Sequence, residues 1–137
     1  MKVFFDTNVL FAAFATRGLC ADLFSHVLRE HELLVGEVVI EELRHKLRLK
    51  IKLPKTSLDE IEEMLREHQV VPKPKKHLGL KITDPDDEWV VASAVAGGAD
   101  VLVTGDAAVL KVAKRSPIPI VNPRGLWELL RATNPAK

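Results

Sequence analysis

The chain has 137 residues, 47% of them hydrophobic and 28% charged, and its 20 basic residues nearly balance 19 acidic ones. This composition indicates one globular domain over residues 1–137, and the single cysteine excludes a small fold that depends on intrachain disulfides. With no secretory signal and no apolar run near the roughly 20 residues that span a bilayer, we expect a cytoplasmic protein.

Short apolar runs alternate with amphipathic stretches along the chain. The apolar runs predict strands at residues 2–5, 32–35, 69–72, 100–103 and 118–121. Helical spacing of apolar residues predicts helices at about 8–15, 19–30, 57–67, 85–96 and 107–114, another after Gly36, and a last one starting at Asn122-Pro123. This alternation predicts a three-layer α/β/α sandwich around a central, mostly parallel sheet.

Two helices carry local signals that mark their ends. Asp84 is a preferred N-cap residue, Pro85 suits the first helical position, and Gly97-Gly98 ends the helix. Ser57 and Glu60 have the spacing of a capping box, which predicts that a helix begins at Ser57. The helix that follows Asp84 therefore has the best-defined boundaries in the sequence.

Basic residues are concentrated in two stretches, which predicts a polarised surface. In the first, "KLRLKIKL" at 46–53 alternates with period two, so we expect the preceding helix to end near Lys46 and lead into an extended or irregular basic arm. The cations of this stretch expected to bind nucleic-acid phosphates are Arg44, Lys46, Arg48, Lys50 and Lys52. The second group comprises Lys73, Lys75, Lys76 and Lys81.

Acidic residues gather at positions that the predicted sheet brings to one edge. Asp6 follows the strand at 2–5, Asp106 follows the strand at 100–103, and Asp84, Asp86 and Asp87 start the helix that leads into that second strand. Ligands of open α/β sheets bind beyond the carboxyl ends of the strands, so these acids can share one cleft. Crowded carboxylates repel one another unless a cation compensates, and oxygen ligands suit Mg²⁺ or Mn²⁺. An acidic centre flanked by basic stretches predicts a metal-dependent nuclease.

Each of these features also has a purely structural explanation. Acids in a first turn complement the helix dipole, Asp106 can cap the helix after it, and Asn8 can cap the turn after Asp6. A row of cations is commonly a solvated face, and the five histidines lack the spacing of a zinc site. These explanations work one at a time, but they do not explain why the acids coincide at one sheet edge.

Three stretches resemble, in order, the motifs of the PIN-domain family, in particular the VapC-like toxins of bacteria and archaea. The first is "VFFDTNVL", with Asp6 and Asn8, and the second is "VVIEELRHKL", with Glu42. The third is "DPDDEWVVASAVAGGADVLVTGD", with Asp87 and Asp106. The resemblance extends from residue 2 to about residue 130, and the ordered set with this spacing is specific.

This resemblance implies a Mg²⁺ or Mn²⁺ site, cleavage of single-stranded RNA, a homodimer and a small antitoxin protein as partner. Carried over residue by residue, it implies catalytic and metal-binding roles for Asp6, Glu42, Asp87 and Asp106, and supporting roles for Asn8, Asp84 and Thr104. Helical periodicity alone does not choose between Glu41 and Glu42, because both lie off the predicted buried stripe. The resemblance selects Glu42, which directly precedes the apolar Leu43.

Two other functions match parts of the pattern. A phosphatase of the haloacid dehalogenase type also uses Mg²⁺ and an aspartate after an apolar strand, but that family has a second aspartate two residues later, where this chain has Asn8. A non-catalytic RNA- or protein-binding module of PIN type would bind RNA without cutting it. Asn8 argues against the phosphatase, and the complete set of four acids argues against the non-catalytic module.

Overall fold

Five parallel strands form one sheet in the order β3-β2-β1-β4-β5 in the computed structural model, which describes residues 1–133. The strands are β1 (Lys2–Phe5), β2 (Glu32–Gly36), β3 (Gln69–Val71), β4 (Val101–Val103) and β5 (Ile120–Val121). Every neighbouring pair is parallel. The predicted sheet is therefore confirmed, and each predicted strand lies within two residues of its observed position.

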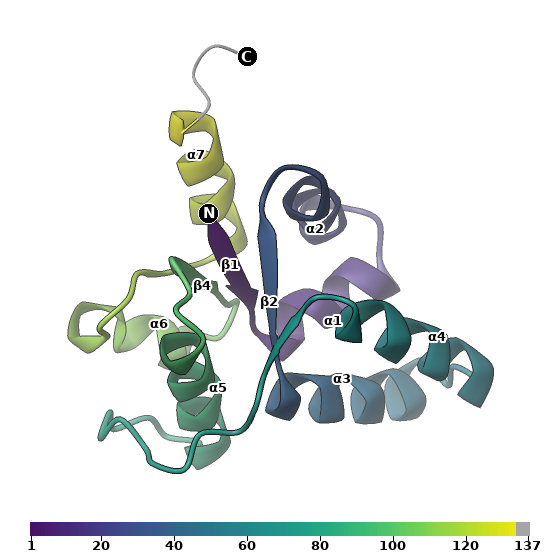
Figure 1. Cartoon of the computed structure of the whole chain (residues 1–137), viewed down its shortest axis with the longest axis horizontal. Coiled ribbons are helices and arrows are strands. Elements are labelled where there is room, and N and C mark those ends of the chain that lie inside the picture. Colours follow the sequence, from purple (N-terminus) through teal and green to yellow (C-terminus); the bar gives the residue numbers. More distant parts are fainter. Residues whose placement is uncertain (134–137) are drawn as a thin grey trace.

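Helices cover the sheet in a three-layer arrangement (Figure 1). They are α1 (Thr7–Ala15), α2 (Leu19–Glu30), α3 (Glu37–Lys50), α4 (Lys55–Arg66), α5 (Pro85–Ala96), α6 (Ala107–Lys111) and α7 (Pro123–Thr133), with a 3₁₀ turn at Ala113–Arg115. Helix α5 packs against β2, β3 and β4, whereas α2 packs against β2 and α7. The predicted α/β/α sandwich is confirmed. None of these helices has the length and apolar character needed to cross a membrane.

The strands are apolar because both faces of the sheet are covered. All three residues of β4 and the last three of β1 are buried, as are the apolar residues of β2. Continuous apolar runs are typical of parallel strands covered on both faces. Phe24 of α2 adds edge-to-face ring contacts with Phe5 and Phe14 at centroid distances of 5.9 and 5.3 Å.

The chain reverses its direction across the sheet at β1. From β1 it steps outward to β2 and then to β3, and α5 then carries it back to β4 on the other side of β1. Such a topological switch point leaves a crevice at the carboxyl ends of the two strands beside it, here β1 and β4. Phe5 pairs with Val103 in this register, so the residues that follow both strands emerge side by side.

Helix α5 begins and ends as its sequence predicts. The Asp84 side chain caps it by accepting a hydrogen bond of 3.0 Å from the amide of Asp86. At its end, a Cβ on Gly97 would lie 2.5 Å from the side chain of Val71, and Gly98 has a φ of 73°. Glycine is required at the first position by close packing and favoured at the second by the left-handed backbone.

The expected extended basic arm is wrong, because α3 continues as a helix to Lys50. Both a period of two and a period of 3.6 fit this stretch, and burial decides between them. Leu43 and Leu47 are each 1% exposed on the same side of the helix, whereas Leu49 is 56% exposed. A helix places Leu43 and Leu47 on one buried face, and the free energy gained by burying both outweighs the cost of leaving Leu49 exposed.

The predicted capping box at Ser57 is also wrong. Helix α4 begins two residues earlier, at Lys55, with Pro54 as N-cap and no hydrogen bond from a capping side chain. The fixed φ of proline, here −69°, suits a helix start. The earlier start also places Lys55 one turn before Asp59, and the two form an ion pair of 2.8 Å.

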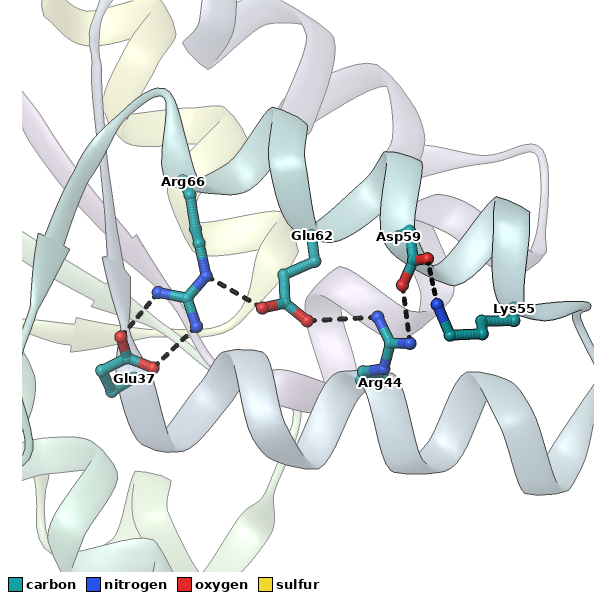
Figure 2. A network of polar contacts seen from close by, with 6 residues as sticks. All are labelled: Glu37, Arg44, Lys55, Asp59, Glu62 and Arg66. Carbon is teal, nitrogen blue, oxygen red and sulfur yellow. Dashed lines mark hydrogen bonds and ion pairs between the residues drawn. The ribbon is translucent and has the colours of Figure 1, made fainter.

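A row of ion pairs joins α3 to α4 (Figure 2). Its members are Glu37, Arg66, Glu62, Arg44, Asp59 and Lys55. Arg66 binds both carboxylate oxygens of Glu37, at 2.6 and 3.0 Å, and Arg44 bridges Asp59 at 2.8 Å and Glu62 at 3.2 Å. These side chains are partly exposed, so each pair contributes modestly, but the bidentate geometry fixes how the two helices lie against each other.

The helical path of α3 predicts very different costs for two neighbouring leucines. Leu47→Ala should destabilise the protein by about 2–5 kcal/mol, because it leaves a cavity in the core. Leu49→Ala should stay within about 0.5 kcal/mol of wild type, because that side chain is largely exposed. Urea unfolding of both variants measures the difference. Equal losses would contradict the helix and return this stretch to an extended arm.

Candidate metal centre

Asp6 is a buried carboxylate at the end of the central strand. It is 4% exposed, and it also caps α1 by accepting a hydrogen bond of 2.7 Å from the amide of Thr7. Thr104 donates its hydroxyl to the other oxygen at 2.6 Å. Burial raises the pKa of Asp6, the hydrogen bonds from Thr104 and Thr7 oppose this, and the nearby charges of Glu42 and Asp106 add to it. The structural alternative in which Asn8 caps this turn does not hold, since Asp6 is the N-cap of α1.

Thr104 connects the ends of β1 and β4. It is fully buried directly after β4, where the parallel register places it beside Asp6. While its hydroxyl donates to Asp6, the same oxygen accepts a hydrogen bond of 3.0 Å from the amide of Asp106. One Asp106 oxygen then caps α6 by accepting from the amide of Ala108 at 2.8 Å. One threonine thus orients two acids that lie a hundred residues apart in the sequence.

Glu42 reaches this edge of the sheet from α3. One of its oxygens accepts a hydrogen bond of 3.3 Å from Thr7, the residue after Asp6, and the other pairs with Lys46 at 3.1 Å. Lys46 also donates to the side-chain oxygen of Asn8 at 2.8 Å. The start of α1 and the middle of α3 are therefore joined by Thr7, Glu42, Lys46 and Asn8.

Glu41 lies on another side of α3. It lines an open groove of about 530 Å³ together with Arg44, His45, Arg48, Leu53, Lys55 and Leu58. This groove lies between α3 and the start of α4, whereas Glu42 contacts the residue next to Asp6. The structure thus separates the two glutamates that periodicity alone left equivalent.

Asp87 adds a fourth acid from the first turn of α5. Burial raises its pKa to about 7, and the charges of Asp106, Asp6, Asp84 and Glu42 contribute to the shift in that order. A carboxyl responds in this way only when the other acids lie close enough to repel its charge. The four predicted acids and Asp84 are therefore electrostatically coupled, with Asp84 itself exposed as the cap of α5.

The chemistry of this acidic cluster suits a hard divalent cation. Carboxylate oxygens are the ligands that Mg²⁺ and Mn²⁺ prefer. Burial is the main cause of the raised pKa values of Asp6 and Asp87, and the repulsion between acids that adds to it is what a bound cation would relieve. Among residues 1–133, however, no three acidic, histidine or cysteine side chains lie in an arrangement that could hold a metal ion. Lys46 supplies one positive charge inside the cluster through its pair with Glu42.

The predicted basic residues do not form one surface. Arg44 faces Asp59 and Glu62 of α4, whereas Lys46 faces the acids. Arg48 lies 3.5 Å from His45, and the ammonium of Lys50 lies 5.8 Å from the ring centroid of Phe11 in α1. Residues two apart point to opposite sides of a helix, so the alternating cations that would line one side of an extended arm are divided.

Two residues of the cluster were missed by the sequence analysis. Thr7 holds Glu42 beside Asp6, and no local signal marks it, because its partner lies 35 residues away. Lys46 was assigned to the basic arm, although its spacing of four residues from Glu42 is that of an ion pair within a helix. Reading the stretch with helical period would have identified this pair.

The PIN domain family model matches residues 2–108, more than half of the chain. The chain belongs to the PIN-domain family. PIN domains are a nuclease fold, and the predicted family assignment is confirmed. Comparison of the sequence with curated proteins gives no significant match.

Solved structures share this PIN fold over most of the chain. VapBC2 from Rickettsia felis, bound to a DNA fragment from its promoter, is 19% identical with a TM-score of 0.63, covering 89% of this chain and 98% of that one. DNA-bound VapBC from Salmonella typhimurium is 18% identical with a TM-score of 0.64, covering 90% and 98%. The PIN domain endonuclease Utp24 is 19% identical with a TM-score of 0.55, covering 88% and 84%. At these identities the likeness establishes the fold.

The raised pKa of Asp87 predicts how stability depends on pH when no divalent cation is present. The folded chain holds this proton up to about pH 7, whereas an unfolded aspartate releases it near its ordinary value of 3.8. The stabilisation from the bound proton is therefore full below pH 3.8 and is lost as the pH rises through about 7. In EDTA, the melting temperature should fall from about pH 5 to about pH 8, and Asp87→Asn should reduce this fall. Asp86→Asn, the control at an exposed neighbour, should keep it. An identical fall in all three proteins would contradict the coupling.

Proposed function

We propose that this PIN domain is a metal-dependent endoribonuclease that cleaves single-stranded RNA, with Mg²⁺ or Mn²⁺ as cofactor. The observation that carries the proposal is that hydrogen bonds through Thr7 and Thr104 hold Glu42, Asp6 and Asp106 together at the switch point of the sheet, and the raised pKa of Asp87 indicates that its carboxyl lies near them. Membership of a nuclease fold supports the same reaction class, as does the likeness to the endonuclease Utp24. The haloacid dehalogenase alternative is set aside, because the chain belongs to a different family.

In this proposal, Asp6, Glu42, Asp87 and Asp106 hold the metal. A bound divalent cation lowers the pKa of a water molecule and stabilises negative charge on the phosphodiester. Thr104 holds Asp6 and Asp106 in place through its single hydroxyl, at 2.6 and 3.0 Å. Such bonds orient the ligands before the substrate arrives.

Two further residues support this centre from α1 and α3. Thr7 orients Glu42 by a hydrogen bond of 3.3 Å, and Lys46 links Glu42 to Asn8. The ammonium of Lys46 also offsets part of the negative charge, which limits the repulsion that an approaching RNA phosphate meets. Asp84 supports Asp87 by capping the first turn of α5, in which Asp87 lies.

We also assign the chain to the toxins of toxin–antitoxin pairs, as a homodimer with a small antitoxin protein as partner. The support is the shared fold with the VapBC structures from Rickettsia felis and Salmonella typhimurium and with FitAcB from Neisseria gonorrhoeae. The VapC-like motifs around Asp6, Glu42 and Asp106 point in the same direction.

Metal dependence tests the proposed reaction directly. Labelled single-stranded RNA should be cut in the presence of Mg²⁺ or Mn²⁺, and EDTA should abolish cutting because the acids alone do not ionise water near neutral pH. Asp106→Asn should retain the cap of α6, since asparagine is an equally good N-cap, and lose cleavage. Cleavage that persists in metal-free protein with EDTA would overturn the metal mechanism. RNA binding without cleavage would favour the non-catalytic module.

The two adjacent glutamates provide a matched pair for the ligand assignment. Glu42→Gln should reduce cleavage by more than the roughly 10- to 100-fold typical of residues that only support a ligand. Glu41→Gln should stay near wild type, because Glu41 lines the groove beside Arg44 and Arg48. Gel-based cleavage rates and melting temperatures of both variants are the measurements. The reverse pattern would shift the assignment by one residue, and two active variants would remove α3 from the centre.

A further inference from the structure

The connector between β3 and α5 carries positive charge that the rest of the fold does not neutralise. Residues 72–83 contain four lysines and no acid. Lys75, Lys76 and Lys81 are exposed, and within residues 1–133 none of them forms an ion pair. On α3, by contrast, Arg44 and Lys46 are both paired with carboxylates. Within residues 1–133, Arg48 and Lys50 of α3 and Lys52 just after it also lack a carboxylate partner, but Arg48 lines the groove on the Glu41 side of the helix and the ammonium of Lys50 lies 5.8 Å from the ring centroid of Phe11. The connector lysines, by contrast, directly precede the acidic start of α5 in the sequence.

The connector is attached to the start of α5 at two points. The ammonium of Lys73 lies 4.7 Å from the ring centroid of Trp89. The ring of His77 lies 3.9 Å from the same indole and is tilted by 38°, while its Nδ1 lies 3.0 Å from the buried carboxylate of Glu88. Lys75 and Lys76 lie between these two contacts. The connector loops out beside the start of α5 (Figure 1), and its anchors, Glu88 and Trp89, directly follow Asp87.

We propose that this connector, residues 73–81, is the surface that binds the phosphates of single-stranded RNA beside the acidic cluster. The proposal rests on the ribonuclease function above. RNA carries a negative charge at every phosphate, and the acids of the centre repel it. Cations fixed at the rim of the centre compensate this repulsion and release counterions from the strand. On α3, Lys46 lies beside the acids and is paired with Glu42. We therefore assign phosphate binding to the lysines of the connector.

The experiment compares two variants that each remove three positive charges. The connector variant carries Lys75→Ala, Lys76→Ala and Lys81→Ala, and the charge-matched comparison variant on α3 carries Arg48→Ala, Lys50→Ala and Lys52→Ala. Binding of a fluorescent single-stranded RNA is measured by anisotropy over a range of salt concentrations. EDTA is present so that the RNA is not cut, and melting temperatures verify that both variants are folded.

The connector variant should bind RNA about tenfold or more weakly at low salt. Its plot of log affinity against log salt should flatten by about two units, since each phosphate contact on a single strand contributes about 0.7. The comparison variant should keep the wild-type slope. An unchanged slope in the connector variant, an equal loss in both variants, or a loss confined to the α3 variant would overturn the proposal.

Two further measurements separate this inference from the proposed reaction. Cleavage of the same RNA by the wild-type protein is assayed in Mg²⁺. A wild type that binds RNA through the connector but never cuts it contradicts the ribonuclease proposal and leaves the binding surface standing. A wild type that cuts RNA, with a connector variant that binds normally, overturns the binding surface alone. Binding of duplex DNA through the connector, with no binding of RNA, would also overturn it.

Discussion

The buried carboxylate of Asp6 imposes the constraint on which the rest of the centre depends. A charge at the end of a central strand is costly unless hydrogen bonds compensate it. The amide of Thr7 and the hydroxyl of Thr104 provide them, and both donors come from the chain segments that leave β1 and β4. Because Thr104 also accepts from the amide of Asp106, one set of bonds fixes the strand pairing, the helix starts and the position of a second acid.

Charges brought together at this edge oppose the stability of the fold. The pKa values of Asp6 and Asp87 are both raised, so the folded chain resists full ionisation of its own acids. Lys46 provides a single positive charge among four carboxylates. Perturbed pKa values of this kind cluster at functional sites.

Much of the fold is predictable because its signals are local. The strand at residues 2–5, the helix at residues 19–30 and the capped start of α5 follow from apolar runs, helical spacing and turn residues. The path of α3 was mispredicted because residues 46–53 fit both a strand period of two and a helical period of 3.6. Only the burial of Leu43 and Leu47 distinguishes the helix from the strand. The contacts of Thr7 with Glu42 and of Thr104 with Asp6 depend on tertiary packing, which no local pattern encodes.

Among the helices that begin at this edge, three are capped by an aspartate: Asp6 caps α1, Asp84 caps α5 and Asp106 caps α6. Asparagine caps a helix as well as aspartate does, and the two amino acids have neighbouring codons. Single substitutions of aspartate by asparagine can therefore remove negative charge from the acidic cluster while each helix keeps its N-cap. A relative with the same fold but without catalytic activity is therefore only a few substitutions away. Such a relative would be identified by asparagine at these positions and not by a change of fold.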